Sequence, residues 1–324
     1  MFNNAYYPIE LHSHTYHSDG DFTPEDLIEL ASEFGYRGIF ITDHNTSSAF
    51  YELKNKDLKK FPIKIYQGIE WTTFHGHILI LGNEKMHDFT KLNIYNLDAC
   101  IKNLRAEEKN IAIGIAHPYA IGNPICTGCH FEYKVKDYSI FDYLEICNSE
   151  NPMDVYYNNL AYERWTKLIN KGIKFAALSG RDWHKLSDKK SYVAISMIKA
   201  DQDLSMTSVI EAIKNSHTYI SLGPILKFDF GNADLGDEIK KEAILFKFLL
   251  EEGKFSNKDN FSIKNFELLF INNEIVKIRE KIFYNEVVTF DFVPEKGTLR
   301  FEIRGDLNGV KDKKIVITSP IYVK

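Results

Sequence analysis

The stretch IELHSHTYHSDG (residues 9–20) decides the fold, because in it a short apolar run is followed directly by a cluster of polar side chains. Polar clusters in this position are typical of β/α folds, in which the functional groups follow the carboxyl ends of parallel strands. A helix is predicted next, since Thr23 can cap it, Pro24 suits its first position and Gly35 can end it. Strand, polar loop and capped helix together form one β–α unit.

The same alternation of short apolar runs and helical stretches continues to about residue 190 and predicts a parallel sheet or barrel. The further runs are residues 38–42, 63–70, 77–82, 111–118, 143–148 and 175–180. From about residue 224 onward the chain is strand-like, with period-2 alternation and turn residues between the strands, which indicates a β-sandwich. We therefore predict an α/β protein with two domains, residues 1–223 and residues 224–324.

The composition bounds the possible partners of the chain. Hydrophobic residues make up 44% and charged residues 26% of the 324 residues, which is ordinary for a globular protein. The net charge is −5 and no long basic run occurs, so we expect no nucleic-acid partner beyond a nucleotide or a short oligonucleotide. Without a secretory signal or an apolar run of membrane-spanning length, we expect a cytoplasmic protein with no membrane partner. These features leave the oligomeric state open.

Side chains of the kinds that bind metal ions recur at the carboxyl ends of the predicted strands. Ten of the eleven histidines precede residue 190. Burying so many ionisable groups together without a cation would cost several kcal/mol for each group. A metal site therefore explains the pattern better than packing does. The candidates at the strand ends are His12, His14, Asp43, His44, Glu70, His117, Asp182 and His184.

Six short motifs occur in a characteristic order along the chain. They are HSHTYHSDG (12–20), TDHN (42–45), GIE (68–70), GHILILG (76–82), AHP (116–118) and RDWH (181–184). In this order they resemble the motif set of the PHP (polymerase and histidinol phosphatase) superfamily, and within it the CehA/McbA-like metallohydrolases. The resemblance extends over essentially the whole chain. It implies a distorted (β/α)7 barrel of the PHP type followed by a small C-terminal β-sandwich domain.

The resemblance also implies three metal sites that share ligands. The first site would use His12, His14, Glu70 and Asp182, the second Glu70, His77 and His117, and the third Asp19, His44 and His184. Mixed imidazole and carboxylate ligation suits Zn, Mn or Fe, so we expect two to three divalent ions without a choice among these metals. The last motif departs from the family, which commonly has Ser where this chain has Arg181.

By the same resemblance the chain would be a metal-dependent hydrolase, first of all a phosphoesterase for a small phosphorylated or nucleotide-like anion. Hydroxide formed from water on the cations would attack the phosphorus atom. His184 or His77 would protonate the leaving group, and Arg181 would bind a negative charge on the substrate. Hydrolysis of a carbamate or carboxylic ester is the alternative. A non-catalytic binding module is a third hypothesis, from another class of function.

Four further residues near the motifs have two possible roles each. Asp43 could orient an imidazole or make a structural hydrogen bond. His17 could bind a metal or only lie between ligands. Glu145 and Asn148, which end a predicted strand, could line the pocket or lie at the surface.

The Cys126-Thr-Gly-Cys129-His130 segment contains the c-type haem attachment pattern, which without an export signal we do not expect to be used. A structural metal held by Cys126, Cys129 and His130 would need a fourth ligand from elsewhere. A loop stabilised by buried thiols is the simpler interpretation. Lys185, like Arg181, flanks the last motif and could neutralise an anion or form a surface ion pair.

Overall fold

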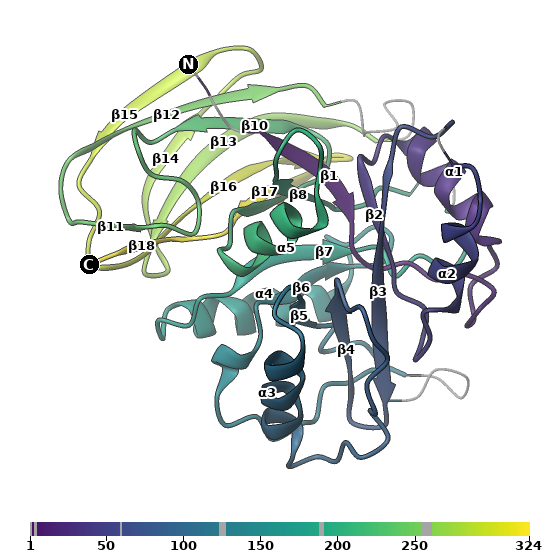
Figure 1. The fold of residues 1–324 in the computed structure, drawn as a ribbon. Coiled ribbons are helices and arrows are strands. Elements are labelled where there is room, and N and C mark those ends of the chain that lie inside the picture. Colours follow the sequence, from purple (N-terminus) through teal and green to yellow (C-terminus); the bar gives the residue numbers. More distant parts are fainter. Residues whose placement is uncertain (1, 3–4, 59, 123–127, 188–190, 254–260) are drawn as a thin grey trace.

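The computed structural model describes the chain except for residues 1, 3–4, 59, 123–127, 188–190 and 254–260. Its N-terminal part alternates strands with helices, as the sequence predicts (Figure 1). The elements are β1 (Tyr6–Glu10), α1 (Pro24–Phe34), β2 (Gly38–Ile41), α2 (Ser48–Lys54), β3 (Lys64–Thr73), β4 (Gly76–Leu81), α3 (Leu97–Glu107), β5 (Ala112–Ile115), the 3-10 turn η1 (Tyr138–Ile140), β6 (Tyr143–Asn148), α4 (Tyr156–Ile169), β7 (Ala176–Gly180), β8 (Ile195–Lys199), α5 (Met206–Lys214) and β9 (Thr218–Ser221).

The first helix, α1, shows why these residues adopt this local structure. The Thr23 side chain accepts a hydrogen bond from the Asp26 backbone N–H at 3.1 Å, and Pro24 occupies the first turn. Gly35 ends the helix with a left-handed φ of 104°, a conformation that glycine adopts without strain. Leu27 and Ala31 are fully buried against the sheet. The predicted cap, start and end of this helix are confirmed.

The sheet that carries these elements is a distorted barrel. Strands β1, β2 and β3 are parallel, β4 runs antiparallel between β3 and β5, and β5, β6 and β7 are parallel. In the described residues no backbone ladder joins β7 to β1. A single parallel bridge between Ser13 and Trp183 joins the segments that follow these two strands, so the ring closes only at the carboxyl ends. The predicted α/β fold of PHP type is confirmed.

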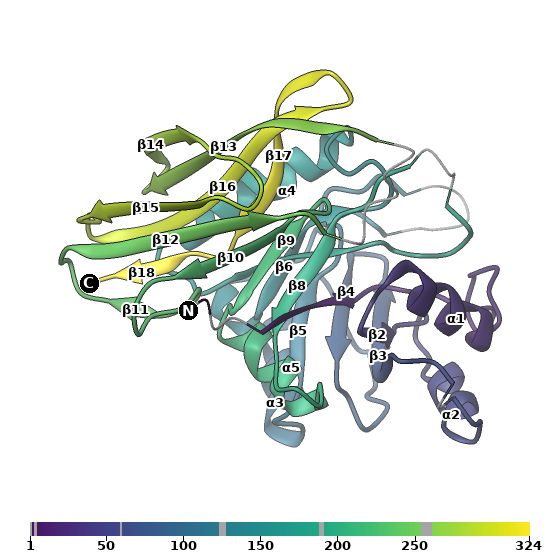
Figure 2. The ribbon, with the colours of Figure 1, turned by 90° about the horizontal axis from the view of Figure 1, so that it is seen from above.

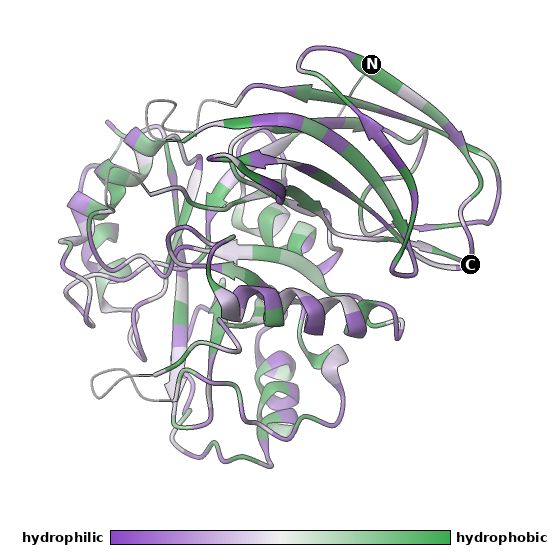
Figure 3. Cartoon of the chain, turned by 180° about the vertical axis from the view of Figure 1, so that it is seen from behind, coloured by the Kyte–Doolittle hydropathy of each residue, from purple (hydrophilic) through white to green (hydrophobic). Residues whose placement is uncertain are grey.

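The C-terminal part is built of strands, which pack as two sheets. The strands are β10 (Ile225–Asp229), β11 (Glu238–Ile239), β12 (Ile244–Glu251), β13 (Ile263–Asn272), β14 (Ile275–Lys281), β15 (Val287–Phe292), β16 (Gly297–Leu307), β17 (Val310–Thr318) and β18 (Ile321–Val323). Strands β10, β12 and β15 form one sheet, and the others belong to the long sheet (Figure 2). Hydrophobic and hydrophilic residues alternate along these strands (Figure 3).

Phenylalanine rings fill the space between the two C-terminal sheets. Phe246 on β12 lies 5.5 Å from Phe301 on β16, and Phe248 lies 5.6 Å from Phe270 on β13, measured between ring centroids. All four side chains are fully buried. This is the packing of a β-sandwich, so that prediction is confirmed.

The two parts of the chain share one sheet and one hydrophobic core. Strand β17 pairs with β9, which precedes the predicted boundary at residues 223/224, through partners such as Ile317 and Ile220. Buried side chains of both parts belong to the same apolar cluster. The division at residues 223/224 stays a prediction. Among the described helices, none combines the length and apolar character needed to cross a membrane.

Candidate metal centre

The loops that leave the carboxyl ends of β1, β2 and β7 meet the β3–β4 hairpin and the end of β5 at one rim of the barrel. All nine residues that the sequence assigns to metal sites lie there, and the structure arranges them around two carboxylates, Glu70 and Asp19. Backbone strain accompanies this convergence. His117 and Asp182 have φ angles of 21° and 53°, which non-glycine residues rarely adopt and which functional sites often retain.

The first cluster contains His12, His14, Glu70 and Asp182. The Nε2 atom of His12 lies 3.2 Å from Glu70 Oε2 and 3.3 Å from Asp182 Oδ1. The Nε2 atom of His14 lies 3.4 Å and 3.2 Å from the same two oxygens. Two imidazole nitrogens thus face two carboxylate oxygens within a few ångströms of one another, an arrangement that could hold one metal ion.

The second cluster forms around the other oxygen of Glu70. Oε1 of Glu70 lies 2.9 Å from His77 Nδ1 and 3.1 Å from His117 Nε2, so the three residues predicted for the second site do come together. His44 also approaches Glu70, with Nδ1 2.9 Å from Oε2, and forms a possible metal-binding group with Glu70 and His77. The closeness of His44 to Glu70 was not predicted from the sequence.

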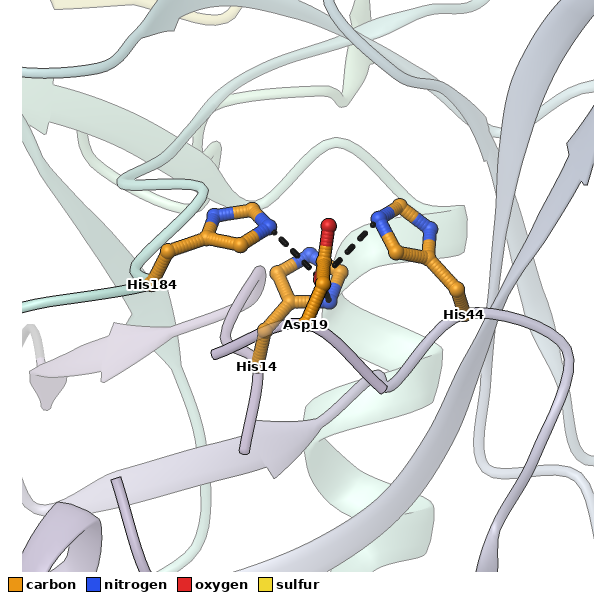
Figure 4. Close-up of side chains that lie close together, drawn as sticks. All are labelled: His14, Asp19, His44 and His184. Atoms are coloured by element: carbon orange, nitrogen blue, oxygen red, sulfur yellow. Dashed lines mark ion pairs between the residues drawn. The ribbon is translucent and has the colours of Figure 1, made fainter. Parts of the chain in front are cut away.

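The third cluster surrounds Asp19. Figure 4 shows His14, His44 and His184 pointing toward its carboxylate. Oδ1 of Asp19 lies 3.0 Å from His184 Nε2, 3.4 Å from His44 Nε2 and 3.9 Å from His14 Nδ1. The sequence predicted Asp19, His44 and His184 for this site, and the structure adds His14 to the group. Because His14 faces the first cluster through Nε2 and the third through Nδ1, its ring connects the two.

The electrostatic state of these side chains suits metal binding. Burial alone would raise the pKa of Glu70, but the neighbouring His12, His77 and His44 hold it well below its usual range. Burial likewise opposes ionisation of Asp182, and His12 and His14 hold the pKa of that carboxyl well below its usual range. Burial lowers the pKa of His14 to about 4. The same carboxylates raise the pKa of His12, His44, His117 and His184, so without a cation these imidazoles carry protons that balance the carboxylate charge. A bound cation would take the place of those protons.

Three buried atoms at the centre of the site also fit a cation. In the described part of the chain, His12 Nε2, His14 Nε2 and Glu70 Oε2 make ion-pair contacts but no hydrogen bond of good geometry, and their residues are fully buried. Buried polar atoms without a well-aligned hydrogen bond cost free energy, which a metal ion bound between them would remove. The donor set of imidazole and carboxylate matches Zn, Mn or Fe.

Comparison with known proteins identifies the family. The model of the PHP domain family matches residues 10–173, which include every predicted ligand except Asp182 and His184. The chain belongs to the PHP domain family. This confirms the superfamily that the six motifs resemble, whereas the CehA/McbA-like subgroup stays a prediction.

Two curated relatives contain segments similar to part of this chain. The chain is 36% identical over 78 residues to the PolC-type DNA polymerase III of Oceanobacillus iheyensis, and 30% identical over 119 residues to that of Lactococcus lactis. The matched parts are 24% and 36% of this chain but only 5% and 7% of the polymerases. The chain thus corresponds to a small part of these much longer proteins.

A solved structure shares the fold over nearly the whole chain. It is a two-domain protein of Bacteroides vulgatus that contains a predicted PHP-like metal-dependent phosphoesterase. The TM-score is 0.56 at 12% identity, and the match covers 98% of this chain and 96% of that one. The fold of this chain is therefore shared, over nearly its whole length, with a known two-domain structure.

Glu145 lies behind the candidate metal centre and holds two of its residues by hydrogen bonds. Its Oε1 accepts a hydrogen bond from His12 Nδ1 at 2.9 Å, and its Oε2 accepts one from the His117 backbone N–H at 3.0 Å. A carboxylate on the far nitrogen of an imidazole fixes the tautomer and turns the other nitrogen toward the metal. Glu145 and Asn148 are 0% and 2% exposed, so the surface alternative considered for them is wrong.

Glu10 is a supporting residue that the sequence reasoning missed. One oxygen of its buried carboxylate accepts hydrogen bonds from the backbone N–H groups of Leu11, His12 and Arg181, at 3.1, 3.0 and 2.9 Å. Burial raises the pKa of Glu10, while the Arg181 guanidinium opposes that shift. Glu10 thereby ties the end of β1 to the end of β7. An acidic residue two positions before the His-x-His segment, in an otherwise apolar run, was the available signal.

Arg181 is buried, with 5% of its surface exposed. Its guanidinium lies over the Trp183 ring, 3.5 Å from the centroid, and its side chain donates to Ser187. Among the contacts of the described residues, none joins its guanidinium to the predicted metal ligands. Its contact with an anionic substrate stays a prediction, and the observed position gives it a packing role beside Glu10.

The remaining candidates lie around the centre rather than in it. His17 places its ring nitrogens 2.7 Å from Glu52 Oε2 and 2.7 Å from Ser48 Oγ. Asp43 accepts hydrogen bonds from the Thr15 backbone N–H at 2.7 Å and from Ser18 Oγ at 2.8 Å, which is the structural alternative for this residue.

Three further candidates lie outside the metal centre. Lys185 lines a surface cavity of about 590 Å³ along α1. Cys129 is buried and His130 is exposed, with its ring 5.6 Å from that of Tyr119. Cys126 lies outside the described residues, so the structural metal suggested for this segment stays a prediction.

Proposed function

We propose that this chain is a metal-dependent hydrolase that cleaves phosphoesters of small anionic molecules and uses two to three divalent ions. The observation that carries the proposal is the arrangement around Glu70, whose two oxygens face five imidazoles within 3.4 Å while its side chain is fully buried. A carboxylate in this position could bridge two cations, and Asp19 could complete a third site. Clustered cations suit the tetrahedral phosphate group because they neutralise its charge.

In this proposal the described side chains have separate roles. Bound cations would activate water and stabilise the charge that develops on the phosphoryl oxygens. Glu70 and Asp182 hold the negative charge that draws cations into the rim of the barrel. Glu145 orients His12, and Glu10 fixes the backbone of both ligand segments. The Bacteroides vulgatus protein that shares the fold contains a predicted metal-dependent phosphoesterase, which agrees with this proposal.

The proposal is tested with purified protein loaded in turn with Zn, Mn and Fe. We expect release of p-nitrophenol from p-nitrophenyl phosphate or bis-p-nitrophenyl phosphate, loss of this activity on chelation, and recovery when metal is returned. Asp182→Asn should abolish activity, whereas the control His17→Gln, whose ring pairs with Glu52, should retain it. Equal activity in metal-free protein would contradict the proposal. Hydrolysis of only an aryl carbamate or acetate would favour the alternative substrate class instead.

A further inference from the structure

A chain of hydrogen bonds runs from the metal centre to the phenol of Tyr157. Glu145, which holds His12, accepts a hydrogen bond from Asn148 Nδ2 at 3.4 Å. Ser149 Oγ donates to Asn148 Oδ1 at 2.7 Å, and the Tyr157 hydroxyl lies 3.1 Å from Ser149 Oγ. The backbone of Ser149 is strained, with a φ of 67°, which places its hydroxyl between the two partners.

The direction of this chain follows from the inventory of donors. The Asn148 carbonyl oxygen can only accept, so Ser149 uses its single proton in donating to it. The bond between Ser149 and Tyr157 must then use the phenolic proton of Tyr157. Tyr157 therefore donates its hydrogen bond to a weak, neutral acceptor, the Ser149 hydroxyl. A stronger acceptor, such as a substrate oxygen, can replace Ser149 as the partner of this proton.

Tyr157 lies on the side of the barrel that carries the candidate metal centre. It lies in the first turn of α4, which follows the carboxyl end of β6 and so starts on the side of the barrel that carries the metal centre (Figure 1). The residue is half-buried. Burial and then the nearby carboxylates of Asp182 and Glu145 raise its pKa, so the phenol keeps its proton at neutral pH.

The histidines first expected to protonate the leaving group are occupied. In His184, Nε2 lies 3.0 Å from Asp19 and Nδ1 lies 2.9 Å from the Asp182 carbonyl oxygen. His77 is fully buried with Nδ1 at 2.9 Å from Glu70. Their role as general acids stays a prediction that this geometry does not favour. A neutral hydroxyl outside the ligand clusters meets the requirement better.

We propose that Tyr157 donates a hydrogen bond, and then its proton, to the oxygen that leaves when the phosphoester bond breaks. This inference rests on the proposed function. The oxygen of the attacking water forms a new bond to phosphorus, and the water gives up one proton to solvent. The electron pair of the broken P–O bond stays on the leaving oxygen, and the phenolic proton moves to that oxygen. The resulting phenolate takes a proton from solvent, which reaches the half-buried ring. Ser149 positions the phenol between turnovers.

The test compares Tyr157→Phe with the matched control Tyr156→Phe, whose ring is 74% exposed. An alkoxide is a strong base that needs a proton to leave, whereas p-nitrophenolate leaves without one. For glycerol phosphate, kcat/KM should fall about a hundredfold in Tyr157→Phe, the size of a general-acid contribution. For p-nitrophenyl phosphate it should change little. Tyr156→Phe should behave like the wild type. Equal losses with both esters, or no loss, would overturn the inference.

A second readout does not depend on turnover. Binding of inorganic phosphate to the metal-loaded protein, measured by calorimetry, should weaken about fivefold to tenfold in Tyr157→Phe, as expected for one lost hydrogen bond. Metal content should equal that of the wild type. Unchanged phosphate binding would show that the phenol does not reach the anion and would overturn the inference. If the wild type hydrolyses neither ester, the proposed function fails, and phosphate binding alone decides the position of Tyr157.

Discussion

Replacing Glu70 by Gln is the sharpest perturbation of the metal centre, because it keeps the size of a buried side chain and removes only its charge. Oε1 faces His77 and His117, and Oε2 faces His12, His14 and His44, all between 2.9 and 3.4 Å. The amide of Gln can offer one oxygen to one side only. Its NH2 group, which cannot bind a cation, must face the other.

The expected magnitude follows from the lost charge. At a separation of about 4 Å and an effective dielectric constant of about 20, one pair of unit charges interacts by about 4 kcal/mol. This corresponds to about a thousandfold in affinity for a cation that loses the carboxylate. Glu145→Gln should cost only about 10-fold to 100-fold, because Glu145 touches His12 and the His117 backbone rather than the ion. His184→Ala should also cost less than Glu70→Gln, since it faces the Asp19 cluster alone.

The assay is competition with a chelator of known affinity, followed by metal content and rate measurements on each variant. His17→Gln serves as the matched control, because His17 pairs with Glu52 outside the clusters. The account predicts affinity losses in the order Glu70, Glu145, His17. If Glu70→Gln kept wild-type metal content and rate, the bridging role of Glu70 would be refuted.

Three further predictions concern stability and recognition. Against the effect of burial, Glu70 and neighbouring carboxylates raise the pKa of His44 to about 10 and the pKa of His117 to about 9. In metal-free protein the ion pairs of these two histidines therefore stabilise the fold fully below the unfolded pKa of about 6.5. This stabilisation is lost as the pH rises toward 9 to 10. The melting temperature of chelated protein should fall across that window, and a metal-loaded sample that fell equally would contradict cation binding there. Glu10→Gln leaves the buried Arg181 without its opposing charge and should lower the free energy of unfolding in urea by about 3 kcal/mol. The double variant Glu10→Gln, Arg181→Met should recover part of this loss. If the losses of the two substitutions simply added, Glu10 and Arg181 would not form a charge pair. Arg181→Ala should reduce kcat/KM for a phosphomonoester and a neutral ester equally if its role is packing, and a loss confined to the phosphomonoester would restore its proposed contact with anions.

The sequence was sufficient to predict which residues converge, because the relevant side chains follow buried strands whose carboxyl ends must meet. His12, Glu70 and Asp182 come from β1, β3 and the end of β7, far apart in the chain, yet the β/α pattern alone places their strand ends at one rim. The order of the PHP motifs then divided them among sites. The start and end of α1 could also be predicted, because the cap at Thr23 and the turn at Gly35 depend only on neighbouring residues.

Contacts that depend on exact backbone angles could not be predicted from the pattern of apolar and polar residues. Asp43 accepts hydrogen bonds from Thr15 and Ser18, and these bonds hold the loop from Thr15 to Asp19 in a turn. The turn brings Asp19 back to His14, which therefore belongs to the third cluster. The Ser149–Tyr157 contact depends on a left-handed Ser149 and on where α4 begins. No periodicity encodes either of these.

The direction of the Arg181 side chain does not follow from strand alternation. Alternation holds for extended backbone, whereas Arg181 and Asp182 lie beyond the end of β7 and Asp182 has a left-handed φ of 53°. The structure shows Arg181 stacked on Trp183. Glu10 stands two residues before His12, and its carboxylate ties both ligand segments together.

The central claim is that divalent cations occupy the rim of the barrel around Glu70 and Asp19. Anomalous scattering from a crystal of the metal-loaded protein, collected at the Zn, Mn and Fe edges, tests it most directly. The account predicts two or three peaks, among His12, His14, Glu70 and Asp182, beside His77 and His117, and next to Asp19, with the peak beside His77 and His117 lost in Glu70→Gln. The absence of any peak at these residues, or peaks only elsewhere in the molecule, would contradict it.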